Sequence, residues 1–165
     1  LVQQYDNLFV LQSMTKFFAI PGLRLGFGLL PPEAAVRMEF GKDVWNVNLL
    51  AQKAGTAALA DFGYQQLSRE LLTQEISYVT AELKKLDGLR FFEPGVNFIL
   101  LDLAGCGITV DELLQQMRAR SILLRDCRNY PGLAETFVRM AVRSHEENRK
   151  VLEAFEEIWQ GRQGK

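Results

Sequence analysis

Two apolar runs near the N-terminus, residues 8–11 and 25–30, enclose a polar and basic stretch. Each run is short and bounded by turn-forming residues, which predicts two buried strands. The stretch between them carries a single lysine, Lys16, close to hydroxyl side chains and followed by a proline–glycine pair. A lysine held between two strands suits an amine that bonds covalently to a carbonyl compound, rather than one that is only solvated. We therefore interpret this stretch as an active-site loop.

Residues 13–26 read Ser-Met-Thr-Lys-Phe-Phe-Ala-Ile-Pro-Gly-Leu-Arg-Leu-Gly. This segment resembles the cofactor-lysine motif of the aminotransferase superfamily, fold type I of the pyridoxal-phosphate enzymes. The resemblance implies that Lys16 binds pyridoxal 5'-phosphate covalently, and that Ser13 and Arg24 hold the cofactor phosphate with help from Thr15. A guanidinium and hydroxyls match a dianionic phosphate well. Without the motif, a lone lysine in a loop is most often a solvated surface residue.

Composition excludes several other classes of function. Lys and Arg number 19 against 20 Asp and Glu, so no overall basic field is present to bind nucleic acid or anionic lipid. The cysteines, Cys106 and Cys127, and the only histidine, His145, lack the spacing of metal ligands, and we interpret the cysteines as structural thiols in a reducing compartment. The sequence shows neither a signal peptide nor a transmembrane stretch, so we expect a cytoplasmic protein. The Cys and His spacing predicts that no metal is bound, and the resemblance implies that the substrate is a small molecule.

The resemblance also predicts the domain organisation. The chain begins at Leu1 without an initiating methionine and soon reaches Lys16, whereas the corresponding lysine in the family lies past the middle of the polypeptide. We therefore expect a C-terminal fragment. Residues 1–41 would end a truncated cofactor-binding large domain, residues 42–88 would form connecting helices, and residues 89–165 would form a small C-terminal domain. The expected fold class is α/β, a remnant of an aminotransferase-like large domain plus a small α/β sandwich.

Hydrophobic spacing and capping signals predict the individual elements. Thr109 with Glu112 and Ser144 with Glu147 are predicted capping boxes. Trp45 is interpreted either as a core aromatic beside a helix cap at Asn46 or Asn48, or as part of the family pattern. Beyond the first two strands, we expect helices at residues 31–40, 49–60, 64–86 (with Leu67 and Leu71 on its apolar stripe), 110–120 and after Ser144, strands at 91–92, 96–103, 122–125 and 137–142, and a frayed tail at 160–165.

An arginine in the middle of a predicted strand points to a second functional position. Strand alternation places Val138 and Met140 on one face of residues 137–142, and Arg139 with Arg143 on the other. A mid-strand arginine needs an acidic partner or an acidic ligand, because burying it unpaired is costly. A salt bridge or a solvated edge is the alternative. In the resembled family, the arginine matching Arg139 binds the substrate α-carboxylate.

Residues 122–133, Ile-Leu-Leu-Arg-Asp-Cys-Arg-Asn-Tyr-Pro-Gly-Leu, resemble the branch of the family that contains threonine-phosphate decarboxylases of the cobalamin pathway and histidinol-phosphate aminotransferases. The resemblance implies that Arg125 helps to bind a substrate phosphate, although Asp126 simply neutralising Arg125 is the alternative. We expect decarboxylation of O-phospho-L-threonine to aminopropanol phosphate by a homodimeric parent enzyme. A histidinol-phosphate or other aminotransferase, and an inactive scaffold or interaction domain, are the competing hypotheses.

Overall fold

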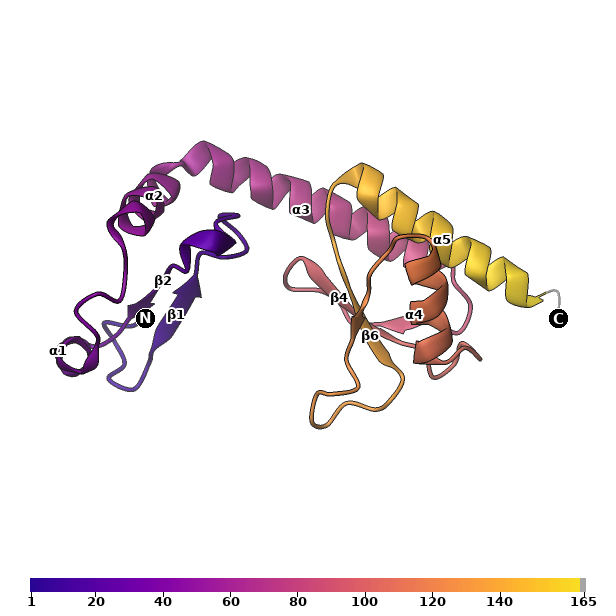
Figure 1. The fold of residues 1–165 in the computed structure, drawn as a ribbon, viewed down its shortest axis with the longest axis horizontal. Coiled ribbons are helices and arrows are strands. Elements are labelled where there is room, and N and C mark those ends of the chain that lie inside the picture. Colours follow the sequence, from indigo (N-terminus) through magenta and orange to yellow (C-terminus); the bar gives the residue numbers. More distant parts are fainter. Residues whose placement is uncertain (164–165) are drawn as a thin grey trace. The chain divides into compact units, whose positions relative to one another are not determined.

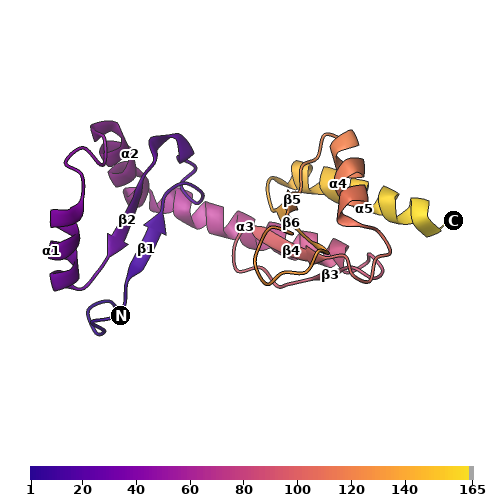
Figure 2. The same ribbon diagram turned by 60° about the horizontal axis from the view of Figure 1, so that its bottom comes forward.

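A computed structural model describes residues 1–163 as two compact units, Leu1–Ser68 and Arg69–Lys165 (Figures 1 and 2). The division falls inside helix α3 (Phe62–Leu83). The predicted three-part division of the chain stays a prediction. No described helix is both long and apolar enough to span a membrane.

The first unit is built on a β-hairpin. Strands β1 (Val10–Ser13) and β2 (Gly26–Leu29) pair antiparallel, with Ser13 opposite Gly26. The two predicted strands therefore form, but the prediction that they are buried is wrong, since Leu11 in β1 is 81% exposed. Among the described residues this sheet has only two strands, so no neighbouring strand shields its edges.

Two helices complete this unit, α1 (Pro32–Gly41) and α2 (Leu49–Ala60), with a short 3-10 helix η1 (Pro21–Leu23) in the hairpin loop. Asn48 caps α2, because its side chain accepts a hydrogen bond from the Ala51 backbone N–H at 2.8 Å, which confirms one of the two predicted caps. The interpretation of Trp45 as a core aromatic is wrong. Its side chain is 89% exposed, in the turn between α1 and α2.

The second unit is an antiparallel sheet covered on one face by helices, which confirms the predicted small α/β sandwich (Figure 2). The buried core lies between the sheet and the helices α3, α4 and α5. The strand order is β3-β4-β6-β5, from β3 (Arg90–Phe91), β4 (Phe98–Asp102), β5 (Arg125–Asp126) and β6 (Phe137–Ala141), and the remaining helices are α4 (Val110–Ala119) and α5 (His145–Gln163).

Local chemistry explains how these elements begin and end. Both predicted capping boxes form, at Thr109 for α4 and at Ser144 for α5. Gly88 follows α3 with a positive φ of 75°, and a Cβ there would collide with the Gly105 carbonyl, so glycine is required. Cys106 is buried, and this burial raises the pKa of its thiol to about 11, as expected for a structural cysteine.

Several predicted boundaries differ from the structure. Leu67 and Leu71, placed on the apolar stripe of α3, are 68% and 51% exposed. Residues 122–124 are not paired, because the Ile122 N–H donates to the Met117 carbonyl and closes the end of α4 instead. The predicted frayed tail is helical through Gln163, and residues 164–165 lie outside the described residues.

Candidate active site

The predicted cofactor residues all lie in or beside one loop of the first unit, residues 14–25, which we call the lysine loop. The hairpin fixes its two ends, because the Met14 N–H donates to the Leu25 carbonyl at 3.1 Å, just beyond the last strand pair. A Cβ on Gly26 would come within 2.9 Å of the Gln12 carbonyl oxygen, so this close approach requires glycine. Met14 is 1% exposed and anchors the loop, whereas Lys16 is exposed.

The polar side chains of the lysine loop form two small local arrangements. Ser13 Oγ donates to Thr15 Oγ1 at 3.0 Å and accepts from the Thr15 N–H at 3.3 Å, which brings the two hydroxyls together. Arg24 has a left-handed backbone with φ of 52°, and its Nη1 donates to the Pro21 carbonyl at 3.1 Å. Among the described residues, no carboxylate forms an ion pair with Lys16 or Arg24. Two hydroxyls and a guanidinium without an acidic partner fit a phosphate-bearing cofactor by their chemistry.

Sequence reasoning missed one residue that supports the lysine loop. Tyr64, in the first turn of α3, donates its hydroxyl to the carbonyl of Phe17 at 2.7 Å. Its ring also meets the Phe17 ring edge-on, with centroids 6.2 Å apart. This contact fixes the backbone next to Lys16. The two partners lie 47 residues apart, so no local sequence pattern predicts this hydrogen bond.

The second unit brings Arg125 and Arg139 together. Arg125 in β5 lies directly opposite Arg139 in β6, in an antiparallel register that puts both on the same face of the sheet. This is the face away from the helices, since Val138 and Met140 point into the core as predicted. We call these two residues the arginine pair. Like charges directly opposite one another repel, so such a pair favours an anion between or beside them.

Neither member of the arginine pair is neutralised by a carboxylate of the described residues. The Arg139 guanidinium lies 4.3 Å from the centroid of the Phe98 ring. Arg125 Nη2 donates to Asn129 Oδ1 at 3.3 Å, and its guanidinium lies 5.8 Å from the Tyr130 ring. Among the described residues, the alternative of a salt bridge for Arg139 is therefore wrong, and Asp126 forms no direct ion pair with Arg125, although the Arg125 charge contributes to lowering the pKa of the Asp126 carboxyl.

Asp126 pairs with Arg128 instead of Arg125. Hydrogen bonds from the Arg128 side chain and backbone lower the pKa of the Asp126 carboxyl to about 2. Arg143 was predicted on the same face as Arg139, but it follows the end of β6 and pairs with Glu147 of α5, with its Nε 2.8 Å from the carboxylate. Of Arg125, Arg139 and Arg143, the two predicted to bind substrate are the two that form no ion pair with a carboxylate of the described residues.

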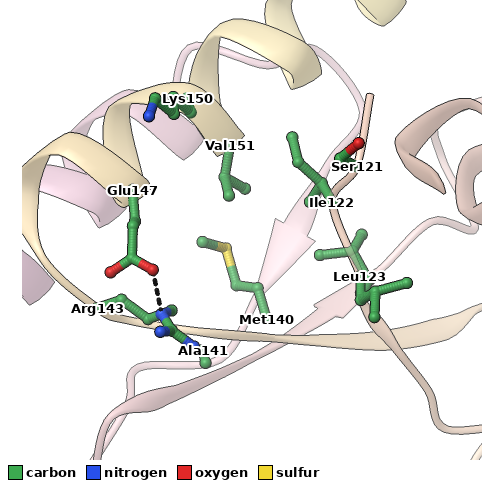
Figure 3. A pocket seen from close by; sticks show the side chains of 10 residues that line it. Ser121, Ile122, Leu123, Met140, Ala141, Arg143, Glu147, Lys150 and Val151 are labelled. Atoms are coloured by element: carbon green, nitrogen blue, oxygen red, sulfur yellow. Dashed lines mark ion pairs between the residues drawn. The ribbon is translucent and has the colours of Figure 1, made fainter. Parts of the chain in front are cut away.

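A pocket of about 370 Å³ lies beside the end of β6, between residues 121–124 and the first turns of α5 (Figure 3). Ile122, Met140 and Val151 point into it, and the Arg143–Glu147 ion pair borders it. None of the six predicted site residues lines this pocket. Its apolar floor continues the core, and we assign it no chemistry.

A buried polar cluster holds the start of α5 against α3. Glu75 is 6% exposed, and its carboxylate accepts from Asn148 Nδ2 at 2.8 Å and lies 3.0 Å from His145 Nδ1. The Asn148 amide also bonds the backbone N–H and C=O of Arg143, directly after β6. This cluster fixes the exit of the strand that carries Arg139. Within the described residues, no group of three metal-ligating side chains is present.

Comparison with known proteins places the chain in a defined family. A sequence model of aminotransferase class I and II matches residues 1–155. A Caldanaerobacter subterraneus protein, whose name assigns it provisionally to the threonine-phosphate decarboxylases, is 38% identical over 97% of this chain. The threonine-phosphate decarboxylase of Salmonella typhimurium is 36% identical over 94%. The chain spans 43% and 42% of these two relatives, less than half of their length.

Solved structures agree with this placement. The crystal structure of histidinol-phosphate aminotransferase from Clostridium acetobutylicum matches with a TM-score of 0.92 at 32% identity. The match covers 97% of this chain and 48% of that protein. The crystal structure of L-threonine-O-3-phosphate decarboxylase from Porphyromonas gingivalis also matches, with a TM-score of 0.81 at 27% identity, so relatives of both reaction types share this fold.

Proposed function

The chain belongs to the aminotransferase class I and II family, and on this premise we propose that it is the C-terminal portion of a longer pyridoxal-phosphate enzyme that decarboxylates O-phospho-L-threonine. The arginine pair is the observation that carries the proposal, because two uncompensated guanidinium groups in register suit a substrate with two anionic groups. The two relatives described above with the name threonine-phosphate decarboxylase, at 38% and 36% identity, support the same substrate.

The lysine loop would hold the cofactor. Ser13, Thr15 and Arg24 would bind its phosphate through hydroxyl and guanidinium donors, and the Lys16 amine would be the point of covalent attachment. When bound, pyridoxal phosphate supplies an electron sink for the bond that breaks at the substrate α-carbon. The Lys16 amine would also donate or accept a proton at that carbon.

The arginine pair would hold the substrate. Arg139, with its guanidinium over the Phe98 ring, would present a bidentate fork to the α-carboxylate, and Arg125 would bind the phosphate. The relatives described above are more than twice as long as this chain, and we propose that the enzyme to which it belongs is longer too. We also propose that this enzyme is a homodimer.

Histidinol-phosphate transamination is the second candidate, favoured by the TM-score of 0.92 to an aminotransferase. The two reactions differ in a measurable way. Decarboxylation of O-phospho-L-threonine releases carbon dioxide without a second substrate, whereas transamination requires a 2-oxo acid as amino acceptor. Release of carbon dioxide by the longer enzyme without an acceptor is the expected result. Turnover of histidinol phosphate only when the acceptor is present would instead assign the aminotransferase reaction.

Replacing each arginine by lysine tests the roles of the arginine pair. Arg139→Lys keeps the charge but loses the fork, and we expect a loss of roughly 1.5–3 kcal/mol in transition-state binding for substrates with an α-carboxylate. Arg125→Lys should lower kcat/KM for O-phospho-L-threonine and leave kcat/KM for unphosphorylated threonine little changed. The measurement is kcat/KM of the longer enzyme with O-phospho-L-threonine, threonine and histidinol phosphate. Equal losses for phosphorylated and unphosphorylated substrates in Arg125→Lys contradict the phosphate assignment.

A scaffold without activity is the remaining alternative for the chain alone. Mixing the 165-residue chain with pyridoxal phosphate, and following absorbance before and after borohydride reduction, tests whether the lysine loop is formed without the rest of the enzyme. A reducible chromophore attached to Lys16 supports a formed cofactor site. Its absence supports a scaffold role for the isolated chain.

A further inference from the structure

The Arg128 guanidinium binds two carboxylates, those of Asp111 and Asp126. Its Nη1 and Nη2 donate to the Asp111 carboxylate at 3.0 and 2.7 Å, and its Nε and Nη2 donate to the Asp126 carboxylate at 3.1 and 2.7 Å. The Arg128 backbone N–H also donates to Asp126 Oδ1 at 3.0 Å. Because the donors of the planar fork are occupied on both sides, Arg128 is not itself available to bind a further anion.

The contacts of Arg128 connect two elements that the sheet ladder does not join. Asp111 lies in the first turn of α4, and Asp126 ends β5. β5 is an edge strand of only two residues, so few ladder hydrogen bonds hold it. Fixing Asp126 to α4 therefore restrains a segment that backbone pairing alone leaves loosely held.

The turn that follows β5 carries the neighbours of Arg125. Asn129 accepts from Arg125 Nη2, and the Tyr130 ring lies 5.8 Å from its guanidinium. Arg128 lies between these contacts and β5 in the chain, with its side chain fixed by five hydrogen bonds. The hydrogen bonds of Arg128 to the two carboxylates therefore fix the backbone of the turn from which Asn129 and Tyr130 contact Arg125.

Arg128 also removes negative charge from the neighbourhood of the arginine pair. Asp126 is the residue next to Arg125, and the Arg125 charge already makes a minor contribution to the lowered pKa of its carboxyl, so an Asp126 carboxylate without Arg128 would attract the Arg125 guanidinium more strongly. Paired to Arg128, it leaves Arg125 and Arg139 as cations without an acidic partner among the described side chains.

We propose that Arg128 is a positioning residue of the arginine pair, holding the β5 turn against α4 and neutralising Asp126 so that Arg125 stays free to bind the substrate phosphate. This inference rests on the function proposed above. It assigns selectivity for phosphorylated substrates to a residue that does not touch the substrate.

The test compares Arg128→Ala, Arg128→Lys and the double variant Arg128→Ala/Asp126→Asn in the longer enzyme. For Arg128→Ala we expect kcat/KM for O-phospho-L-threonine to fall roughly tenfold, mainly through KM, the order of one lost charge-assisted hydrogen bond. For unphosphorylated threonine the change should stay below about twofold, because Arg125 is not used. Asp126→Asn should recover part of the loss, since it removes the charge that competes for Arg125. A structural role alone predicts no such rescue.

Arg120→Ala is the matched control, since Arg120 also pairs with a carboxylate, at 3.0 Å to Glu157, and has a side-chain exposure of 35% against 31% for Arg128. It should leave the substrate preference unchanged. Arg128→Lys keeps the charge without the two-sided fork and tests the proposal even if Arg128→Ala does not fold. An unchanged KM for O-phospho-L-threonine in Arg128→Lys, or equal losses for both substrates in Arg128→Ala, overturns it. Arg125→Ala measured in parallel separates the two levels, because an unchanged phosphate preference there refutes the proposed function itself.

Discussion

At the scale of single residues, Lys16 carries the strongest chemical expectation. Lys16→Ala in the longer enzyme should keep the fold but lose covalent cofactor attachment and nearly all turnover, because among the described residues no other amine lies in the lysine loop. Lys16→Arg should fail in the same way, since a guanidinium stays protonated. The measurement is borohydride reduction followed by mass spectrometry of the labelled peptide. Lys53→Ala, which changes an exposed lysine of α2, is the control. Near-normal turnover of Lys16→Ala would contradict the assignment.

Asp126 links the stability of the chain to pH. Its pKa is about 2 in the folded state, below the ordinary value of about 3.9 for aspartate. A lowered folded pKa contributes stability above the unfolded pKa, and this contribution is lost as the pH falls from about 4 through about 2. We expect the difference in urea midpoint between the wild type and Asp126→Asn to shrink over this range. Because the Asp126 side chain is 37% exposed, added salt should reduce the difference at pH 5, and a difference independent of pH would contradict the linkage.

Residues differ in how far sequence reasoning could locate them. Arg139 followed from strand alternation, and Lys16 and Arg24 from a contiguous motif, so each could be read locally. Tyr64 and the contact of Arg128 with Asp111 could not, because the partners lie 47 and 17 residues away, in other parts of the fold. Long-range hydrogen bonds between side chains leave no periodic signal in a sequence.

At the scale of elements, the buried cluster at the start of α5 sets where β6 ends. Asn148 is 1% exposed and bonds both backbone groups of Arg143 as well as the Glu75 carboxylate. Asn148→Ala removes these three hydrogen bonds and leaves the Arg143 backbone groups without this partner and Glu75 with His145 alone, and we expect a loss of about 3 kcal/mol in the free energy of unfolding. Chemical denaturation checks this value. Ser144→Ala, which removes only the exposed cap of the same helix, should cost about 1 kcal/mol, and an equal cost for both variants would show that burial of the cluster is unimportant.

The elements themselves were largely predictable because helix signals are local. Helix α2 begins and ends at the predicted residues, and α4 follows its capping box and ends one residue before the predicted end. Strand β5 was less predictable. The apolar run before it, residues 122–124, has the composition of a strand, but Ile122 at its start bonds the end of α4 instead. Strand pairing depends on what lies alongside, which a single run of residues does not specify.

At the scale of the whole molecule, the two units differ in how much apolar surface they bury. Among the described residues, Met14 and Ala51 are the only buried hydrophobic residues of the first unit, whereas the second unit contains a continuous core. Large hydrophobic side chains of the first unit, such as Leu11, Phe40 and Trp45, are more than 80% exposed. Exposed apolar surface of this extent, beside an unpaired strand edge, favours association.

We therefore expect the isolated 165-residue chain to self-associate through its first unit. Sedimentation velocity over a range of concentrations should show a rise in average mass, and Leu11→Lys should shift this rise to higher concentration because a charge on the edge strand opposes strand pairing. Leu123→Lys is the matched control, since Leu123 is 82% exposed against 81% for Leu11 but belongs to the second unit. A chain that stays monomeric at high concentration contradicts the expectation. A larger effect of Leu123→Lys would instead place the contact in the second unit, and equal effects would contradict a contact confined to the first, so the pair of variants identifies which apolar surface drives association.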